Sequence, residues 1–318
     1  MIDEPLHAMI EQLCADGSIE RIDNADTETS LLTALNTLGI FYRKSDRRLE
    51  IESPRPLINQ ESIQSQLGKS ALLDGFEWQY QLLTESTNAD ALRLFECGRK
   101  PCIAIAEMQS DGRGRRGRQW LSPFAKNIIC TVGLPKSIEG CNPGLLSIVT
   151  GLALVDALAK SAIDGVELKW PNDLYYQNRK LGGILIESKM IADQAYFFAI
   201  GFGINVMMDT EDLSTIPQPV TSIDLIADNP ISRDTILTEA IRHVVKAIND
   251  FDRSSVSEIV DRFQANDAFK NQAIRVKYGD ELIDGLNLGI NSEGQLKLQS
   301  GQGVREFSAA DISIRGNP

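Results

Sequence analysis

Residues 70 to about 265 alternate between short, strand-like apolar runs and longer helical stretches, and this pattern leaves few folds open. The longest helical stretch, from about Pro143 to Ile163, is apolar on most faces, so we expect it to be buried. The strand-like runs are 76–83, 102–108, 127–134, 166–171, 182–188 and 197–206, and the helical stretches are 86–96, 144–162 and 233–251. This part of the chain is predicted to be one unit of mixed strands and helices.

Smaller modules flank this unit. Before it, the sequence predicts apolar-periodic helices at 6–14 and 31–40 and an alternating hairpin arm from Arg48 to Ile51. Pro54 and Pro56 then break the chain before a short helix around 58–67. The final fifty residues alternate in short strands between Gly-containing turns, which is typical of a small β-barrel. We place the domains at 1–62, 70–268 and 270–318.

The composition is that of a soluble globular protein, with 318 residues of which 42% are apolar, and a net charge of −12. Non-specific attraction to nucleic acid comes from clustered Lys and Arg, so we do not expect it of this acidic chain as a whole. There is no run of eighteen apolar residues and no basic, apolar leader at the start. These features predict no membrane span and a cytoplasmic location.

The cysteines are odd in number and have no CxxC spacing, which argues against a disulfide framework and against a zinc site. We expect buried free thiols. The five residues are Cys14, Cys97, Cys102, Cys130 and Cys141.

A glycine-rich basic stretch, DGRGRRGRQW, fills residues 111–120. Arginine offers a fixed fork of donors to carboxylate and phosphate oxygens, and glycine lets the backbone approach a ligand, so the stretch suits an anion. Gly112, Gly114 and Gly117 satisfy GxGxxG, but no helix pattern follows and the P-loop pattern is missing. A solvated basic turn or a nucleic-acid patch remains an alternative.

A second polar segment, KWPNDLYYQNRKLGGILIE, covers residues 169–187. Lys169 ends a predicted strand, Asn172 and Asp173 follow a proline in a turn, and Lys180 precedes two glycines. Lysines can neutralise phosphate charge during nucleotidyl transfer, and a carboxylate can orient a metal or an amine. Asp173 could instead only form an Asx turn, and Trp170 is expected to pack.

Two shorter polar segments complete the set. Ser86, Thr87 and Asn88 open a predicted helix, where the hydroxyls could cap the helix or hold a small polar ligand. GFGINV, at 201–206, ends a predicted strand.

In this order and at these separations, STN, EMQSDGRGRRGRQWLSPF, KWPNDLYYQNRKLGGILIE and GFGINV resemble the biotin protein ligases, also called biotin–[acetyl-CoA-carboxylase] ligases. The resemblance is strong over about 80–205 and rests on architecture elsewhere. It implies an α+β fold with a catalytic domain similar to class II aminoacyl-tRNA synthetases. It also implies a winged-helix-like N-terminal module and an SH3-like C-terminal β-barrel.

The resemblance implies an enzyme that uses ATP to activate biotin as biotinyl-5′-AMP, with release of pyrophosphate. The biotin is then transferred to one lysine of biotin carboxyl carrier protein. Mg²⁺ is expected because ATP is normally used with it. A homodimer is expected when ligand is bound, and no protein ligands for a metal are assigned.

Site residues also follow from the resemblance. The loop from Gly112 to Gly117 is expected to order over biotin and the adenylate. Arg115 would retain the adenylate, and Lys180 would bind the carboxylate and phosphate oxygens. Catalysis is assigned to Arg115, Lys169, Asp173 and Lys180. Biotin binding is assigned to Ser86, Thr87, Asn88, Gln109, Arg113, Arg115, Lys180 and Gly183. ATP binding is assigned to Gly112, Gly114, Arg116, Gly117, Arg118, Trp120, Asn172 and Asn205.

Asp111 departs from the family pattern, which has a small residue before the loop. Its charge could loosen adenylate retention, or it could form a salt bridge with Arg116 or Arg118.

Some members of the family also repress biotin-synthesis genes through the N-terminal module. Here residues 1–60 hold eleven acids against six bases, and Asp23, Asp26 and Glu28 lie where a DNA-reading helix is expected. DNA phosphates repel that balance, so we interpret the module as a degenerate winged helix for which DNA is not an expected partner. The basic stretch RKSDRR keeps repression open.

Three functions therefore stay open from the sequence. The first is a biotin protein ligase, and the second is the same ligase acting also as a biotin-operon repressor. The third is a lipoate or other acyl-adenylate ligase, against which the intact GRGRRG and KWPND motifs argue.

Overall fold

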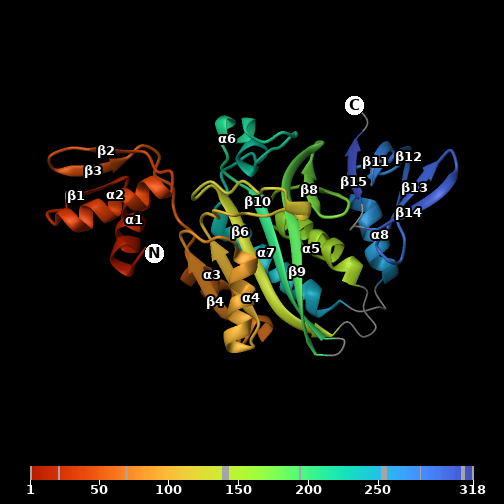
Figure 1. The fold of residues 1–318 in the computed structure, drawn as a ribbon, viewed down its shortest axis with the longest axis horizontal. Helices are drawn as coiled ribbons and strands as arrows, with labels where there is room; N and C mark the ends of the chain where they lie inside the picture. The colour runs from red at the N-terminus through yellow and green to blue at the C-terminus, as the bar shows by residue number, and fades with distance from the viewer. Residues whose placement is uncertain are drawn as a thin grey trace.

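The computed structural model describes residues 2–20, 22–68, 71–137, 143–192, 195–251, 256–279, 281–308 and 312–316. Over these ranges the chain forms three sheets, which follow one another along the long axis of the molecule in chain order (Figure 1).

The N-terminal sheet has the strand order β1-β3-β2 and is backed by helices α1 and α2. These elements are α1 (Glu4–Asp16), β1 (Ser18–Glu20), α2 (Ala25–Thr37), β2 (Tyr42–Lys44) and β3 (Arg48–Ile51). The predicted start of the second helix at residue 31 is wrong, because Asn24 Oδ1 accepts the backbone N–H groups of Asp26 and Thr27 at 3.0 Å and caps a longer helix. Asp26 and Glu28, which precede the predicted helix in the sequence, therefore occupy the first turn of α2, where the helix dipole favours negative charge.

The central sheet orders its strands β4-β5-β6-β10-β9-β8-β7 within the described residues. They are β4 (Glu77–Gln81), β5 (Cys102–Ala106), β6 (Asn127–Ser137), β7 (Glu167–Lys169), β8 (Asp173–Tyr176), β9 (Arg179–Ala192) and β10 (Ala195–Asn205). β4 and β5 are parallel and the other neighbours antiparallel. Every predicted strand of this unit is present, but Asp173 begins β8 and pairs with Lys169, so its placement in a turn is corrected.

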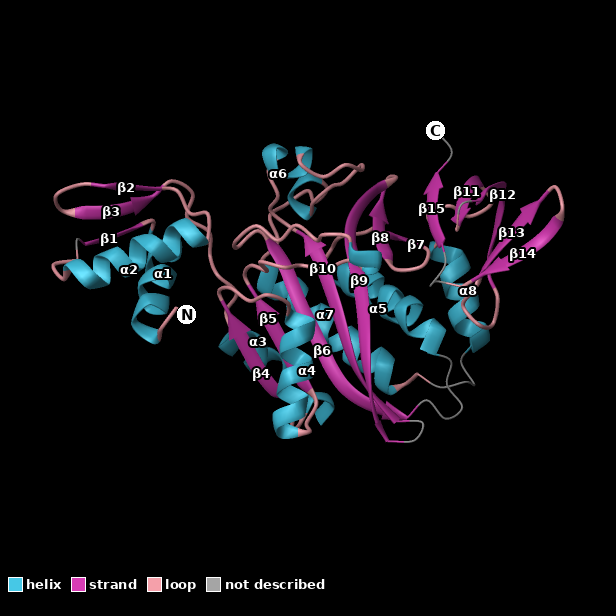
Figure 2. Ribbon diagram, viewed as in Figure 1, coloured by secondary structure: helices cyan, strands magenta, loops and turns pink. Residues whose placement is uncertain are grey.

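Helices cover both faces of the central sheet (Figure 2). α5 (Leu146–Lys160) and α7 (Arg233–Asn249) pack on one face and enclose the main hydrophobic core. α4 (Thr87–Gly98) packs on the other face over a smaller cluster that includes Phe95 and Phe197. α3 (Gln60–Leu67) contacts α7, and α8 (Val256–Asn266) contacts α5. The sequence does not predict α8 or α6 (Thr210–Ser214).

The stretch Pro143–Lys160 is long and apolar enough to cross a membrane by length and composition alone. It is the expected interior helix, and ten of the residues of α5 are buried against the sheet and α7. Its hydropathy is therefore explained by the protein core.

The C-terminal sheet is antiparallel, with the order β14-β13-β12-β11-β15 in the described part of the chain. Its strands are β11 (Ala273–Tyr278), β12 (Glu281–Ile290), β13 (Leu296–Ser300), β14 (Gly303–Phe307) and β15 (Ile312–Gly316). Leu296, Leu298 and Phe307 belong to the same buried cluster as the central sheet. The indole of Trp170, 2% exposed, donates to the Gly294 carbonyl at 2.9 Å, so the C-terminal sheet also supports the KWPND motif, and Trp170 packs as expected.

A buried ion pair fixes the linker between the first two sheets. Arg233, at the start of α7, donates to Glu107 Oε2 at 2.6 Å and to the Pro56 carbonyl at 2.7 Å. Glu107 Oε1 also accepts the Ile58 N–H at 2.6 Å and the Tyr80 hydroxyl at 2.9 Å. The linker is thus bonded to the residue that directly follows β5, two positions before Gln109.

The free thiols agree in part with expectation. Cys14, Cys102 and Cys130 are buried, but Cys97 is exposed at the end of α4, which corrects its predicted burial. Cys141 lies outside the described residues.

Candidate active site

The basic stretch folds as a small hairpin between β5 and β6. The Gly114 N–H donates to the Arg118 carbonyl at 2.6 Å, and the Trp120 N–H donates to the Gly112 carbonyl at 2.8 Å. The tip is a single 3₁₀ turn, Arg115–Gly117, in which Arg116 and Gly117 have positive φ of 60° and 71°. No longer helix follows, which agrees with the argument against a dinucleotide site.

The arginines of this hairpin point to different partners. Arg113 is exposed and bonded to Asp111 at 2.5 Å, so the expected salt bridge from Asp111 to Arg116 or Arg118 is wrong. Arg115 is half-buried, and its guanidinium lies 3.5 Å from Asn172 Oδ1. Arg116 and Arg118 remain on the exposed side of the hairpin. Arg115 is therefore the hairpin side chain that reaches the KWPND motif.

Positive charge is crowded around Arg115. Burial lowers the pKa of this guanidinium, and Arg116 and Arg118 lower it further, while Asp173 opposes them. An arginine stays protonated in a protein despite such shifts. A group that is both desolvated and surrounded by like charge is stabilised when an anion binds beside it.

Lys180 and Asp173 form an ion pair between strands β9 and β8. Lys180 Nζ lies 2.8 Å from Asp173 Oδ1, and the side chains are 16% and 19% exposed. The backbone of Lys180 donates to the Pro219 carbonyl and accepts from the Thr221 N–H, both at 2.9 Å. Fixed main-chain and side-chain bonds hold this ammonium in one place. It also lies 5.7 Å from the centre of the Trp120 ring.

Lys169 has a different environment from Lys180. Its Nζ donates to the Tyr175 hydroxyl at 2.9 Å and lies 4.9 Å and 5.7 Å from the ring centres of Tyr175 and Phe269. Burial and the charge of Asp173 raise the pKa of Tyr175, so the phenol stays protonated. The two ammonium groups therefore lie near one turn, as predicted, but in separate contacts.

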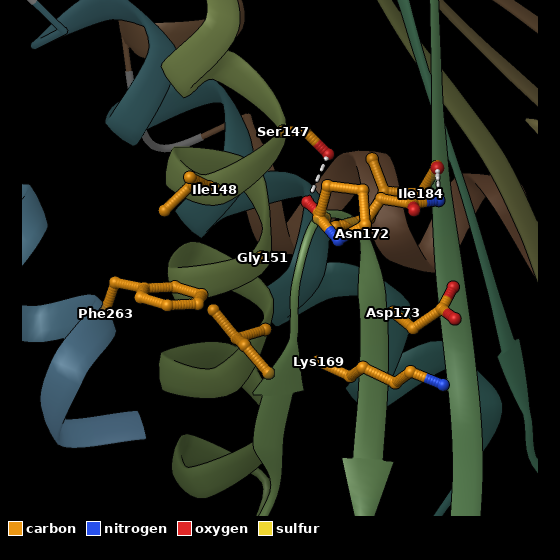
Figure 3. A pocket seen from close by; sticks show the side chains of 10 residues that line it. Ser147, Ile148, Gly151, Lys169, Asn172, Asp173, Ile184 and Phe263 are labelled. Carbon is orange, nitrogen blue, oxygen red and sulfur yellow. Dashed lines mark hydrogen bonds between the residues drawn. The ribbon is translucent and has the colours of Figure 1, made fainter. Parts of the chain in front are cut away.

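Residues of α5, α8 and strands β7 to β9 line a narrow, closely packed hollow beside these residues (Figure 3). Asn172 is fixed at its rim, because Asn172 Nδ2 donates to the Ile184 carbonyl at 2.7 Å. Ser147 Oγ donates to the Pro171 carbonyl at 3.1 Å on the other wall. Lys169, Asn172 and Asp173 are thus fixed side by side.

A buried polar network opens α4. Ser86, Thr87 and Asn88 are at most 6% exposed. Ser86 occupies the N-cap position, but its side chain makes no capping bond, so capping does not explain its hydroxyl. The Thr87 N–H donates to Gln109 Oε1 at 3.0 Å.

Three other members of this network, Thr131, Glu187 and Ser122, were not predicted from the sequence. Thr131 Oγ1 lies 2.7 Å from Asn88 Oδ1, and Glu187 Oε2 accepts from Asn88 Nδ2 at 2.8 Å. Ser122 Oγ accepts from Gln109 Nε2 at 3.4 Å. The sequence offered two signals for them, which are Thr131 inside an otherwise apolar strand and Glu187 directly after GGILI.

Trp120 and the GFGINV segment lie next to each other. A Cβ on Gly203 would lie 2.6 Å from Trp120 ring atoms, so the indole rests on bare backbone of β10. Trp120 Nε1 is buried without a hydrogen-bond partner among the described residues. Asn205 is 2% exposed and donates to the Thr221 carbonyl at 3.0 Å, which ties it to the segment that holds Lys180.

The structure therefore brings Thr87, Asn88 and Gln109 together as a neutral polar site. A cationic site containing Arg115, Asn172, Asp173 and Lys180 is built on the hairpin, the start of β8 and β9, where Gly183 lies next to the Lys180–Asp173 pair. Arg113, Arg116 and Arg118 lie outside both groups. Within the described ranges, no three His, Cys, Asp or Glu side chains are grouped to hold a metal.

Comparison with known proteins agrees with this arrangement. Residues 81–205 match the model of the biotin/lipoate A/B protein ligase family, a range that runs from the end of β4 to the end of β10. All the proposed site residues lie in that range.

Curated relatives extend the match along the chain. The bifunctional ligase/repressor BirA of Escherichia coli is 32% identical over 266 residues, which covers 83% of this chain and 80% of that protein. The biotin–[acetyl-CoA-carboxylase] ligase of Mycobacterium tuberculosis is 31% identical over 268 residues, covering 81% of this chain and 96% of that protein.

A solved structure has the same fold. The biotin protein ligase from Aquifex aeolicus, in complex with biotin and ATP, superposes with a TM-score of 0.62 at 24% identity, covering 77% of this chain and all of that one. The curated relatives and the family model, together with this shared fold, show that the chain belongs to the biotin protein ligases of the biotin/lipoate A/B protein ligase family.

Proposed function

We propose that this protein is an ATP-dependent biotin protein ligase that activates biotin to biotinyl-5′-AMP and transfers it to a lysine of biotin carboxyl carrier protein. One observation carries the proposal. A network of hydrogen-bonding groups joins the start of α4 to β9 and to Gln109, just before the hairpin that carries Arg115, and β9 also carries Lys180. A neutral ring with a carboxylate tail, together with a triphosphate, needs both kinds of site.

In the first step the biotin carboxylate attacks the α-phosphorus of ATP, and pyrophosphate leaves. Negative charge then gathers on carboxylate and phosphate oxygens. Lys180, held by Asp173 and by two backbone hydrogen bonds, and Arg115, held near Asn172, supply fixed cations there. Preorganised charge of this kind lowers the barrier without reorganisation during the reaction.

In the second step the ε-amine of the carrier lysine attacks the acyl carbon, AMP leaves, and the amine loses a proton. We assign Asp173 and Lys169 to the side where this amine enters. Ser86, Thr87, Asn88, Gln109 and Gly183 would surround the biotin, with Arg113 at the edge. Gly112, Gly114, Arg116, Gly117, Arg118, Trp120, Asn172 and Asn205 would surround the nucleotide.

Mg²⁺ fits this site only as part of MgATP. Asp173 is the one carboxylate in the cationic cluster as described, and Lys180 already pairs with it. Mg²⁺ keeps several oxygen ligands and is commonly bound by phosphates with one or two carboxylates. When bound, the ion would neutralise phosphate charge.

The test is an incubation of the protein with biotin, MgATP and a carrier domain, followed by intact mass of the carrier. We expect one biotin on one lysine and one pyrophosphate released for each. No change in carrier mass at saturating substrates would overturn the proposal. Lipoate in place of biotin is the arm that detects a lipoate ligase.

We also propose that residues 1–62 are a winged-helix-like module that no longer binds operator DNA. The likeness to a ligase/repressor keeps the second role as an alternative. Against it, wing residues Arg43 and Lys44 are paired with Glu52 at 3.3 Å and Glu28 at 2.8 Å. Cations neutralised within the module contribute little to phosphate binding.

The remaining assignments follow the family resemblance. We propose a class II synthetase-like catalytic domain, an SH3-like arrangement of the C-terminal sheet, domain boundaries as predicted, a ligand-dependent homodimer and a cytoplasmic location. The continuity of the C-terminal sheet with the central core supports a role beside the active site.

A further inference from the structure

The amide of Asn88 has its orientation forced by the groups around it. Asn88 Nδ2 faces two acceptors, the Leu185 carbonyl at 3.1 Å and Glu187 Oε2 at 2.8 Å. The Leu185 carbonyl can only accept, so the amide nitrogen must be on its side, where Glu187 Oε2 also accepts from it. Asn88 Oδ1 is therefore an acceptor.

This orientation passes to Thr131. Thr131 Oγ1 lies 2.7 Å from Asn88 Oδ1 and must give that oxygen its single proton. The hydroxyl oxygens of Thr131 and Thr87 are 2.9 Å apart, and the Thr87 hydroxyl also lies 3.3 Å from Gln109 Oε1, so Thr87 gives its proton to one of these two oxygens. The Thr87 hydroxyl is left with a lone pair to offer to a ligand.

Gln109 is oriented from the other end of the network. Its Oε1 accepts the Thr87 backbone N–H at 3.0 Å, a group that can only donate. Gln109 Nε2 must therefore be on the opposite side, where Ser122 Oγ at 3.4 Å accepts weakly. Gln109 presents N–H to a ligand, beside the lone pair of Thr87.

The network has no room to rearrange. Thr131 is fully buried and Asn88 is 4% exposed. A Cβ on Gly201 would overlap Asn88 Oδ1, so β10 passes directly under the amide. A buried polar chain that is fully satisfied specifies one arrangement, because any reversal leaves a group unpaired.

We infer that Glu187 and Thr131 are positioning residues that fix the direction of these hydrogen bonds and so determine which head group is accepted. The site selects a neutral head group that has N–H for Thr87 beside C=O for Gln109, as a cyclic urea or amide has. A carboxylate head offers no N–H and is rejected. This inference rests on the proposed function.

Two variants of the full chain test it. Glu187→Gln replaces a carboxylate that only accepts with an amide that can also donate, so the Leu185 carbonyl alone then opposes a reversed Asn88 amide. Thr131→Val removes the proton donor at nearly equal volume. Titration calorimetry with biotin alone should give a Kd about tenfold weaker for each. Pyrophosphate release at saturating biotin, and the KM for MgATP, should stay within about twofold of the unmodified protein.

Conservative and matched variants separate this role from general loss of structure. Thr131→Ser keeps the donor and should restore most of the affinity. Thr150→Val changes another fully buried threonine, whose hydroxyl donates within α5 to the Leu146 carbonyl at 2.7 Å. Glu96→Gln changes an exposed carboxylate at the end of α4 that pairs with Lys189. Both controls should bind biotin normally.

The outcomes are distinct. If the unmodified protein does not bind biotin, the proposed function fails. If it binds and both test variants bind equally well, the inference about Glu187 and Thr131 is overturned and the function stands. A loss that the two control variants share also overturns it, because the effect then reports stability.

Discussion

At the scale of single residues, Lys180 is the most constrained cation of the site. Lys180→Ala removes a fixed charge from the position where charge develops, at a cost of about 3 kcal/mol in barrier height, or roughly a hundredfold in rate. We expect pyrophosphate release at saturating biotin and MgATP to fall by that factor. Lys246→Ala, which breaks an exposed pair with Asp250, should not change it. A rate for Lys180→Ala within about threefold of the unmodified protein would reject the role.

Arg115 differs from the other hairpin arginines because it turns inward. Arg115→Gly removes a guanidinium that lies near Asn172 and should let biotinyl-5′-AMP escape before transfer. We expect biotin on lysines of an added bystander protein, read by peptide mass spectrometry. Arg99→Gly is the control, since Arg99 is a left-handed cap with φ of 56° that glycine tolerates. Labelling confined to the carrier would count against this role.

Motif residues could be named from the sequence, but their contacts could not. The order of STN, GRGRRG, KWPND and GFGINV is the basis on which the site residues are assigned. Which arginine turns inward depends on the turn at Arg116 and on the pair between Asp111 and Arg113, which is a matter of hairpin geometry. Thr131 and Glu187 were missed because each lies in a strand whose pattern suggests only packing.

At the scale of elements, α6 is pinned to the chain that follows the hairpin. Lys126 pairs with Asp209 at 2.6 Å and also with Asp212, the two ends of a capping box. The hydrogen bond from Lys126, followed by the Asp212 N–H, lowers the pKa of Asp209 from 3.8 to about 2.

Because the folded pKa of Asp209 is depressed, its stabilising effect is present above about pH 4 and is lost as the pH falls through 2. Lys126→Met should raise the pKa of Asp209 part of the way to 3.8, since the Asp212 N–H remains. Carboxyl-carbon NMR titration measures this directly. An unchanged titration would show that Lys126 does not hold α6.

Elements with a strong apolar periodicity could be predicted from the sequence, whereas elements that depend on tertiary contacts could not. The buried α5 and all six predicted central strands were recognised from apolar runs. β8 was missed because its start, Asp173, follows a proline and looks like a turn, and it becomes a strand by pairing with β7 and β9. The start of α2 was missed because the apolar period begins only at Leu31, although Asn24 caps the helix.

At the scale of the whole molecule, the charge distribution of the N-terminal module predicts that it does not bind operator DNA. The full-length chain with biotin and MgATP should show no salt-sensitive preference for a biotin-operon fragment over random duplex. Arg43 and Lys44 are engaged by Glu52 and Glu28, and α2 begins with acids. A gel shift that is specific and biotin-dependent at physiological salt would mean that the wing outweighs these acids.

The shared core of the central and C-terminal sheets has a consequence for how the molecule opens. Leu296 and Leu298 are fully buried in the same cluster as Ile128 and Ile200. Ile10, Leu31 and Leu35 lie in a second, smaller cluster, to which the central unit contributes the buried residues Leu82, Phe124 and Ala125. Residues that share a core tend to exchange their amide hydrogens as one cooperative unit. Amides of β13 should therefore exchange with deuterium as slowly as those of β6, while α1 and α2 lose protection earlier. The N-terminal module can then fray and reclose many times before the catalytic sheet exposes a single buried strand.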